Sequence, residues 1–200
     1  MRTFADITGR VNNAVRRAVA VTMPAVRFQL AYRTVPLIAL WVLLVLYPNP
    51  LNIFVSVHRV FNPDVDPIAV EPLLAGLPSD PAAIEAEVLR LIPYRYDWET
   101  HGMPWYFPRT VSVVERGQGD CKARAVVLAS ILERLEIPYR INSSFVHVWV
   151  EYDNKVETVF ENPRAKFYQQ DPATGRRFFQ LPEIEWRLWM DSTMEGLWTV

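Results

Sequence analysis

The chain has 200 residues, half of them apolar and 12% aromatic, with a formal net charge of −1 at pH 7. This composition predicts one domain of ordinary size with a packed core plus an appendage, and it excludes a globally disordered chain and a typical nucleic-acid binder. The one cysteine, Cys121, excludes an internal disulfide framework and leaves a free thiol, which is compatible with a reducing compartment or with a secreted domain without bridges.

The sequence of residues 1–57 predicts a membrane anchor that has a basic N-terminal flank. Before Thr34 the chain has six arginines against one acidic residue, and the following residues up to Val57 carry no charge. Two prolines predict the end of a helix after Tyr47, so a helix long enough for a bilayer has to begin near Pro24. The basic flank predicts that the N-terminus is cytoplasmic and that the rest of the chain is extracytoplasmic. A buried helix of a larger soluble assembly and an organelle transit peptide are the alternatives.

Residues 58–79 are predicted to form a proline-rich linker, and residues 80–200 are predicted to form the main domain. Four prolines punctuate the linker, whose apolar periodicity is weak. The domain opens with a predicted helix that Asp80 caps and that has a proline in its first turn. The apolar stripe of this helix consists of Ile84, Val88 and Leu91. The aromatic, loop-like stretch that follows is expected to form the rim of a cleft, with His101 as an exposed loop histidine.

The stretch from Gly117 to Leu135 predicts a helix with the cysteine in its first turn. Gly119 or Asp120 is the expected N-cap, and apolar residues follow at helical spacing. Because unsatisfied N–H groups and the helix dipole favour an anion, they are expected to lower the pKa of the Cys121 thiol. A lone cysteine can equally be a small core residue, so its assignment depends on its partners.

The sequence after this helix predicts a β-hairpin that carries a histidine. Two alternating runs, at 145–152 and 156–163, are separated by an Asp-Asn turn signal. With a two-residue loop, Asn162 becomes a diagonal neighbour of His147 on one face of the sheet. Glu161 then points to the opposite face of the sheet. A loop one residue longer would shift the register by one residue, so that Glu161 in place of Asn162 would share the face of His147.

Together, Cys121, His147 and Asn162 predict a site for nucleophilic catalysis. A thiolate attacks a carbonyl, an imidazole exchanges the proton and later protonates the leaving amine, and a polar group such as an amide fixes the orientation of the ring. The backbone N–H of Cys121 and the side chain of Gln118 are candidate oxyanion donors. The scattered histidines indicate no metal site, and no cofactor is expected.

The residues around this site resemble the transglutaminase-like cysteine hydrolases, which have a papain-like catalytic arrangement. The resemblance lies in GDC at a helix start with AVVLASIL behind it, then IPYR, HVWVEY and an Asn-Pro pair, and it spans Asp80 to Thr174. It implies an α+β fold with a papain/transglutaminase-like core, in which the cysteine helix packs on an antiparallel sheet that carries the other two catalytic residues. The family usually has an aspartate before the proline, where this chain has Asn162. Asp171, which also precedes a proline, is the alternative third residue.

The expected function is thiol-dependent acyl transfer on amide bonds, by a cysteine peptidase or amidase or by a transglutaminase-like enzyme, through a thioester on Cys121. The expected partners are a protein or peptide substrate and, through residues 1–57, a membrane. No nucleic-acid partner is expected, and the oligomeric state stays open. The alternative is a membrane-tethered, non-catalytic interaction module that keeps the fold without turnover.

Overall fold

The computed structural model describes residue 32 and residues 34–156, 158, 161 and 163–180. Contacts between Cα atoms divide the chain into two compact units, residues 1–50 and residues 51–200. In the first unit, a helix of exposed residues runs from Thr34 to Leu46. Its end agrees with the expected stop before the two prolines, and the Tyr47 N–H still donates to the carbonyl of Leu43 at 2.7 Å.

The predicted membrane helix, Pro24–Tyr47, begins outside the described residues. Within the part of the chain that the structure describes, no single helix is long and apolar enough to cross a membrane. The helix Thr34–Leu46 and the next helix, α2 (Leu51–Phe61), meet the requirements of length and composition only when they are taken together as an interrupted pair. The membrane anchor therefore stays a prediction.

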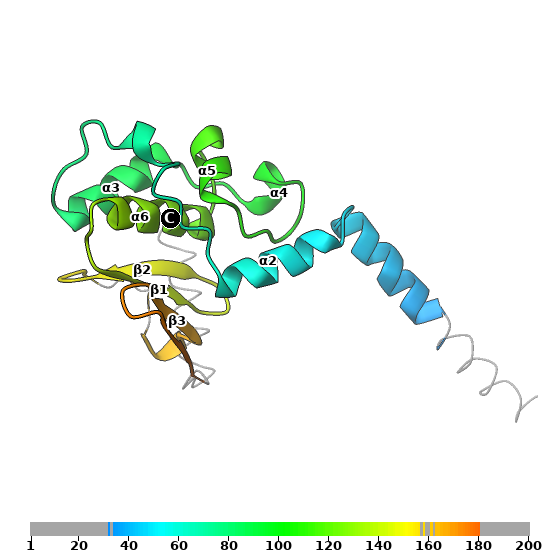
Figure 1. Ribbon diagram of the computed structural model, residues 1–200. Helices are drawn as coiled ribbons and strands as arrows, with labels where there is room; N and C mark the ends of the chain where they lie inside the picture. The colour runs from blue at the N-terminus through cyan, green and yellow to red at the C-terminus, as the bar shows by residue number, and fades with distance from the viewer. Residues whose placement is uncertain (1–31, 33, 157, 159–160, 162, 181–200) are drawn as a thin grey trace, which may run out of the picture. The chain divides into compact units, whose positions relative to one another are not determined.

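The second unit has mixed α and β structure, so the predicted α+β class is confirmed. After α2 its helical elements are η1 (Glu71–Leu73), α3 (Pro81–Leu91), α4 (Asp97–Thr100), α5 (Thr110–Arg116), α6 (Cys121–Arg134) and η2 (Pro163–Ala165). Its strands are β1 (Tyr139–Ser143), β2 (Val148–Tyr152), β3 (Tyr168–Asp171) and β4 (Arg176–Phe179). Figure 1 shows α6 between the sheet on one side and α3, α4 and α5 on the other.

Helix α3 forms as its sequence predicts. Asp80 is the N-cap, and its Oδ2 accepts the N–H of Ala83 at 3.0 Å. Ile84 and Val88 are buried, and they pack in the same core cluster as α6. Because α6 has layers on both sides, nearly all of its residues from Lys122 to Leu132 are buried. The helix that begins at the cysteine is therefore the central element of the core.

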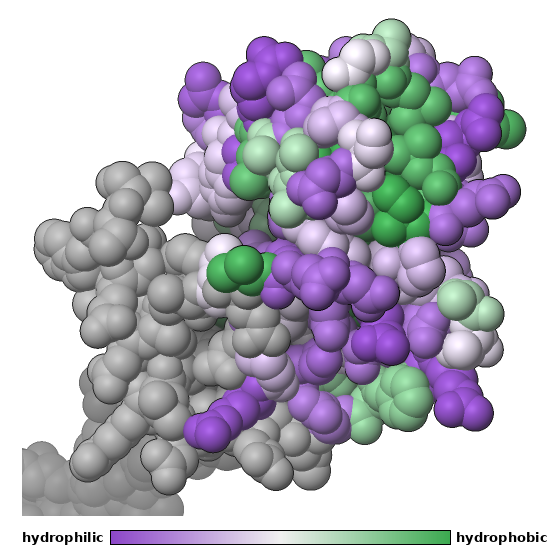
Figure 2. Space-filling model, turned by 90° about the vertical axis from the view of Figure 1, so that its left-hand side faces the viewer, coloured by the Kyte–Doolittle hydropathy of each residue, from purple (hydrophilic) through white to green (hydrophobic). Residues whose placement is uncertain are grey.

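Not every apolar residue lies in this core. Figure 2 shows a face on which hydrophilic residues are interspersed with apolar ones, and the apolar ones gather in one area. Several large apolar side chains outside the core cluster are exposed, among them Ile68, Phe145 and Val156. Scattered exposed apolar residues are normal, whereas a group of them beside a cavity suggests a binding surface.

The sheet is antiparallel, with strand order β2-β1-β3-β4. β1 and β2 form the hairpin, in which Ile141 lies opposite Val150 and Ser143 lies opposite Val148. On its other edge β1 pairs with β3, so that Ile141 also lies opposite Gln170. The cysteine helix packs on β1 and β2 of this antiparallel sheet.

The predicted hairpin between 145–152 and 156–163 is wrong for the described residues. The Asp-Asn turn forms, since Asn154 has a φ of +63° and the N–H of Lys155 donates to the carbonyl of Tyr152 at 3.2 Å. None of the described residues between Tyr152 and Tyr168 belongs to a strand, and the Lys155 side chain donates instead to the carbonyl of Val150 at 2.8 Å. Among the described strands, β2 therefore lies at the edge of the sheet with β1 as its neighbour.

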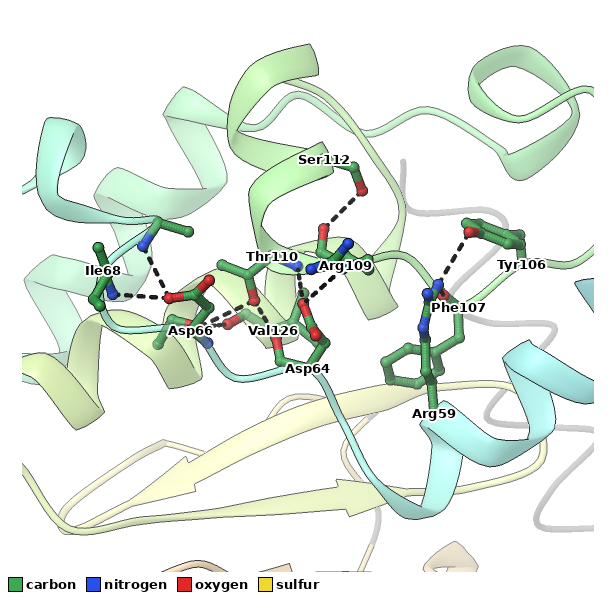
Figure 3. Close-up of polar contacts among 12 residues, drawn as sticks. Arg59, Asp64, Asp66, Ile68, Tyr106, Phe107, Arg109, Thr110, Ser112 and Val126 are labelled. Atoms are coloured by element: carbon green, nitrogen blue, oxygen red, sulfur yellow. Dashed lines mark hydrogen bonds and ion pairs between the residues drawn. The ribbon is translucent and has the colours of Figure 1, made fainter.

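The segment between α2 and η1 is tied to α5 and α6 by a buried polar network. The N–H of Thr110 donates to Asp64 Oδ2 at 3.1 Å, and the Thr110 hydroxyl donates to the Asp64 carbonyl (Figure 3). The same hydroxyl lies 3.1 Å from Ser130 Oγ, which accepts the N–H of Asp66 at 2.9 Å. The Arg59 guanidinium on α2 donates to two groups in the aromatic stretch before α5 (Figure 3). This part of the predicted linker is therefore packed against the domain.

Candidate active site

The loop before α6 brings the cysteine to the helix N-terminus through a close approach at Gly119. The N–H of Gly119 donates to the carbonyl of Pro93 at 3.2 Å, and its carbonyl accepts the N–H of Arg95 at 3.0 Å. A Cβ at Gly119 would overlap the Cβ of Ala123, one turn into α6. Only glycine fits here without displacing the helix, because the neighbouring atom belongs to a short, rigid side chain.

Cys121 is the first residue of α6, and Asp120 is its N-cap, as the sequence predicts. The Asp120 Oδ1 accepts the N–H groups of Lys122 at 3.0 Å and of Ala123 at 3.3 Å. The capping carboxylate thus uses helix donors that would otherwise favour a thiolate. The backbone N–H of Val148, the first residue of β2, acts to lower the pKa of the Cys121 thiol.

The expected lowering of the Cys121 thiol pKa is not found. Burial raises the pKa of the Cys121 thiol, and the adjacent Asp120 carboxylate raises this pKa further. The Lys122 ammonium and the N–H groups of Val148 and Lys122 act in the opposite direction but do not outweigh them. The thiol is therefore protonated in the resting structure, and a base must remove its proton when it reacts.

The two residues that flank Cys121 in the sequence belong to a buried ion-pair cluster. The Lys122 Nζ is 2.9 Å from Asp97 Oδ2 and also bonds Asp120, and each of the three side chains is less than a tenth exposed. Asp97 also accepts the N–H of Tyr106 at 2.8 Å, which fixes the aromatic stretch to the cluster. The sequence analysis missed this cluster, because nothing in the spacing of 97 and 122 predicts that the two residues meet.

His147 lies in the turn between β1 and β2. The His147 N–H donates to Ser144 Oγ at 3.0 Å, and its carbonyl accepts the N–H of Ser144 at 2.8 Å, so both backbone groups are fixed. Its ring is nearly parallel to that of Trp149, with centroids 5.9 Å apart. Burial lowers the pKa of His147, which keeps its imidazole neutral and able to accept a proton at neutral pH.

Cys121 and His147 line the same cavity, which has a volume of about 350 Å³. α6 supplies the thiol, and the turn before β2 supplies the imidazole. The remaining lining side chains are mainly aliphatic or aromatic: Val57, Val60, Phe61, Tyr94, Trp105, Phe145, Val146, Val148 and Phe167, together with Asp120, Lys122, Ser143 and Ser144. Two members of the predicted constellation therefore line one cavity, to which the aromatic stretch also contributes.

The predicted third member, Asn162, lies outside the described residues. Its alternative, Asp171, lies at the end of β3 that is farther from His147. The end of β1 that leads into the His147 turn, Ser143, pairs with Tyr168, whereas Asp171 continues the same register beyond the pair of Ile141 and Gln170. Asp171 lies 3.7 Å from the Arg140 guanidinium and lines a different cavity. It therefore lies about 10 Å along the strand from the position of Tyr168, at 3.3 Å per residue.

Glu161, which the hairpin register turned away from the histidine, is a buried carboxylate. Its Oε1 lies 2.7 Å from Lys155 Nζ, and its Oε2 accepts the N–H of Thr158 at 3.2 Å. Lys155 also lies 2.8 Å from Glu85 Oε1 on α3, so the segment after β2 is held by a charged network. The Glu161 carboxylate raises the pKa of His147, although burial lowers this pKa by more. The sequence analysis left Glu161 out of the site only because the predicted two-residue hairpin loop pointed its side chain to the face opposite His147.

His101 is not an exposed loop histidine, as the sequence analysis expected. It is half-buried, and its ring packs on Tyr106 with centroids 4.4 Å apart. Burial, followed by the nearby Arg116 guanidinium, lowers the pKa of His101 to about 4. This histidine is therefore neutral in the folded protein at pH 7 and belongs to the packing of α4.

Among the described residues, no group of three or more His, Cys, Asp or Glu side chains is arranged to hold a metal ion. In comparisons with known proteins, neither a family model nor a curated protein matches this chain. The chemistry assigned to Cys121 and His147 thus rests on the residues of the site themselves.

Proposed function

We propose that the chain is a thiol-dependent acyl-transfer enzyme that acts on amide bonds, as a cysteine peptidase or amidase or as a transglutaminase-like enzyme. The observation that carries the proposal is that Cys121 and His147 line one cavity from two different elements. The position of the thiol at the start of a helix and the fixed backbone of the histidine support it. These are the two groups that nucleophilic catalysis by cysteine requires.

The proposed reaction has two balanced steps. In the first, the sulfur of Cys121 attacks the acyl carbonyl carbon while the thiol proton passes to His147. The carbon–nitrogen bond then breaks as His147 returns this proton to the leaving amine. In the second, a water molecule or an amine attacks the thioester, its proton passes through His147 to the sulfur, and the carbon–sulfur bond breaks. The backbone N–H of Cys121 would stabilise the oxyanion in both steps.

The direction of the two pKa shifts favours a neutral resting pair. The pKa of the Cys121 thiol is raised and the pKa of His147 is lowered, in both cases first by burial. In such a pair the proton leaves the sulfur during attack, so His147 acts as a general base. Polarisation of the thiol by the N–H of Val148 supports this step.

The finer assignments of fold and location belong to the same proposal. A papain/transglutaminase-like core is supported by the packing of α6 on β1 and β2 and by the position of His147 beside β2. We assign the third position to Asn162 as the group that orients the imidazole, with its buried neighbour Glu161 as the charged group behind it. Residues 1–57 would anchor the enzyme in a membrane, with an extracytoplasmic catalytic domain.

The second candidate is an interaction module without turnover. The raised pKa of the Cys121 thiol favours it, since a protonated thiol is also what a structural cysteine has. The position of His147 on the same cavity favours the enzyme, because a structural cysteine needs no base.

Turnover of acyl amides and activated acyl esters by the full-length chain tests the proposal. Cys121→Ala and His147→Ala are each expected to lower kcat/KM by about 10³-fold or more without unfolding the protein. The control variant is His101→Gln, which changes a histidine outside the cavity and is expected to stay within about twofold. Comparable activity in either Cys121→Ala or His147→Ala would refute the mechanism.

A further inference from the structure

We propose that the cavity beside Cys121 is an acyl-binding site for an apolar acyl group, aliphatic or aromatic. This inference rests on the proposed function and names the substrate class of that same site. A charged or strongly polar acyl group would be bound poorly. Four observations support the inference: the walls of the cavity, its exposed rim, the pairing of its charges and its size.

The walls are apolar and come from separate elements. α2 contributes Val57, Val60 and Phe61, and the loop before β3 contributes Phe167. The ring of Phe167 stacks on that of Phe145, with centroids 5.1 Å apart and an angle of 13° between their planes. These two stacked rings are among the lining residues, and their apolar surface gains free energy from contact with an apolar ligand.

The rim of the cavity exposes large apolar side chains next to the catalytic histidine. Phe145 is 69% exposed and Val146 is 51% exposed, and both belong to the turn that carries His147. Val57 on α2 is 44% exposed. A cluster of exposed apolar side chains around a cavity marks a ligand-binding groove, whereas isolated ones do not.

The charged groups of the lining are already paired. Lys122 and Asp120 bond each other, and Lys122 also bonds Asp97. A carboxylate or ammonium on the acyl group would lose its hydration without gaining either of these groups as a counter-ion. An uncompensated charge is costly to bury, so a charged acyl group is disfavoured.

The size of the cavity sets the length of the acyl group. Its volume is about 350 Å³. A cavity of about 150 Å³ is known to hold benzene, so this one holds roughly twelve carbon atoms. An acetyl group leaves most of the apolar wall in contact with water, whereas an octanoyl or phenylpropionyl group covers it.

The first test is a series of p-nitrophenyl esters hydrolysed by the full-length chain, from acetyl through butyryl, hexanoyl and octanoyl, with a succinyl ester as the charged member. We expect kcat/KM to rise about fourfold for each added methylene until the cavity is filled, and to be lowest for succinyl. Turnover that is equal across the series, or best for succinyl, would overturn the inference and leave the proposed function intact.

A matched pair of variants on α2 locates the effect. Val57→Glu places a carboxylate in the lining and is expected to lower the ratio of octanoyl to acetyl kcat/KM at least tenfold. Val55→Glu changes a comparably exposed valine of the same helix that is not among the lining residues, and it is expected to leave the ratio within twofold. An unchanged ratio in Val57→Glu would contradict the assignment of this wall.

The second test needs no turnover. Because Cys121 is the one cysteine of the chain, its alkylation by iodoacetamide at pH 9 can be followed by intact mass. Octanamide is expected to protect Cys121 at concentrations at which acetamide does not. Absence of protection would overturn the inference whatever the activity. Protection without turnover of any ester or amide would defeat the proposed function and leave the apolar site standing.

Discussion

The carboxylate of Asp120 accepts the N–H of Lys122 at 3.0 Å and so occupies the helix N-terminus at which a thiolate was expected. The same carboxylate adds a negative charge beside Cys121, and burial and this charge together raise the pKa of the thiol. Helix capping and thiol activation therefore compete for the same donors. Asp120, the residue that caps α6, is thus also one that favours the neutral form of the Cys121 thiol.

Asp120→Asn is expected to separate these two roles. Asparagine is as good an N-cap as aspartate, but Asp120→Asn also removes the buried charge that pairs with Lys122, so the free energy of unfolding should fall by about 1–3 kcal/mol. Removal of the charge lowers the pKa of the Cys121 thiol, so alkylation by iodoacetamide should begin at a lower pH than in the wild type. Asp80→Asn, at the cap of α3, is the matched control and should leave the alkylation profile unchanged. An identical profile in Asp120→Asn and wild type would contradict this account.

Glu161 and Lys155 are expected to move the pKa of His147 in opposite directions. The Glu161 carboxylate raises this pKa and the Lys155 ammonium lowers it. In the pH profile of kcat/KM, Glu161→Gln should therefore shift the acid limb to lower pH, and Lys155→Met should shift it to higher pH. Glu161→Gln leaves Lys155 with Glu85 as its remaining carboxylate, and Lys155→Met leaves the buried Glu161 without its ammonium partner, so each should cost about 1–3 kcal/mol of stability. If both variants shifted the acid limb in the same direction, that limb of the pH profile would not reflect the protonation of His147.

Gly119→Ala is expected to destabilise the protein because its Cβ would overlap the Cβ of Ala123. The loss should be about 1–3 kcal/mol, measured by denaturant unfolding. The double variant Gly119→Ala with Ala123→Gly removes the overlap and should recover part of this loss, less about 1 kcal/mol for a glycine inside a helix. If the second substitution made the protein still less stable, the overlap would not be the cause.

His101→Gln is expected to make the protein less sensitive to acid. Because the pKa of His101 is about 4 in the folded state and about 6.5 in a model peptide, the unfolded state binds its proton first as the pH falls. The stability that comes from neutral His101 is thus fully present above pH 6.5 and is lost between about pH 6.5 and 4. Thermal unfolding at several pH values should show a smaller fall in Tm for the variant over this window. Parallel curves for the two proteins would contradict the assignment.

The helices α3 and α6 could be predicted because their signals are local. Asp80 and Asp120 each bond N–H groups within three residues, and the apolar spacing that follows is that of a buried helix face. The order of Cys121 and His147 along the chain was also informative, since both residues line one cavity. Local capping and spacing were sufficient to predict that Cys121 lies in the first turn of a helix capped by Asp120.

The pairing of the strands could not be predicted from the turn signal. Asp153-Asn154 makes a turn, but it does not decide whether β2 pairs with the run before it or the run after it. In the structure Lys155 bonds Val150, Glu85 and Glu161 instead of extending a ladder, and contacts with α3 that decide this are distant in sequence. The position of Glu161 depends on that tertiary network, which explains why the two-strand register misplaced it.

The most direct test of the central claim is the intact mass of the full-length chain, quenched in acid within its first turnovers of an octanoyl ester. The account predicts an adduct with the mass of the acyl group on Cys121, formed and lost at rates that match product release. The adduct should be absent in Cys121→Ala, and it should form far more slowly in His147→Ala. Product formation without an acyl adduct on Cys121, or an adduct that forms as fast without His147, would contradict the claim.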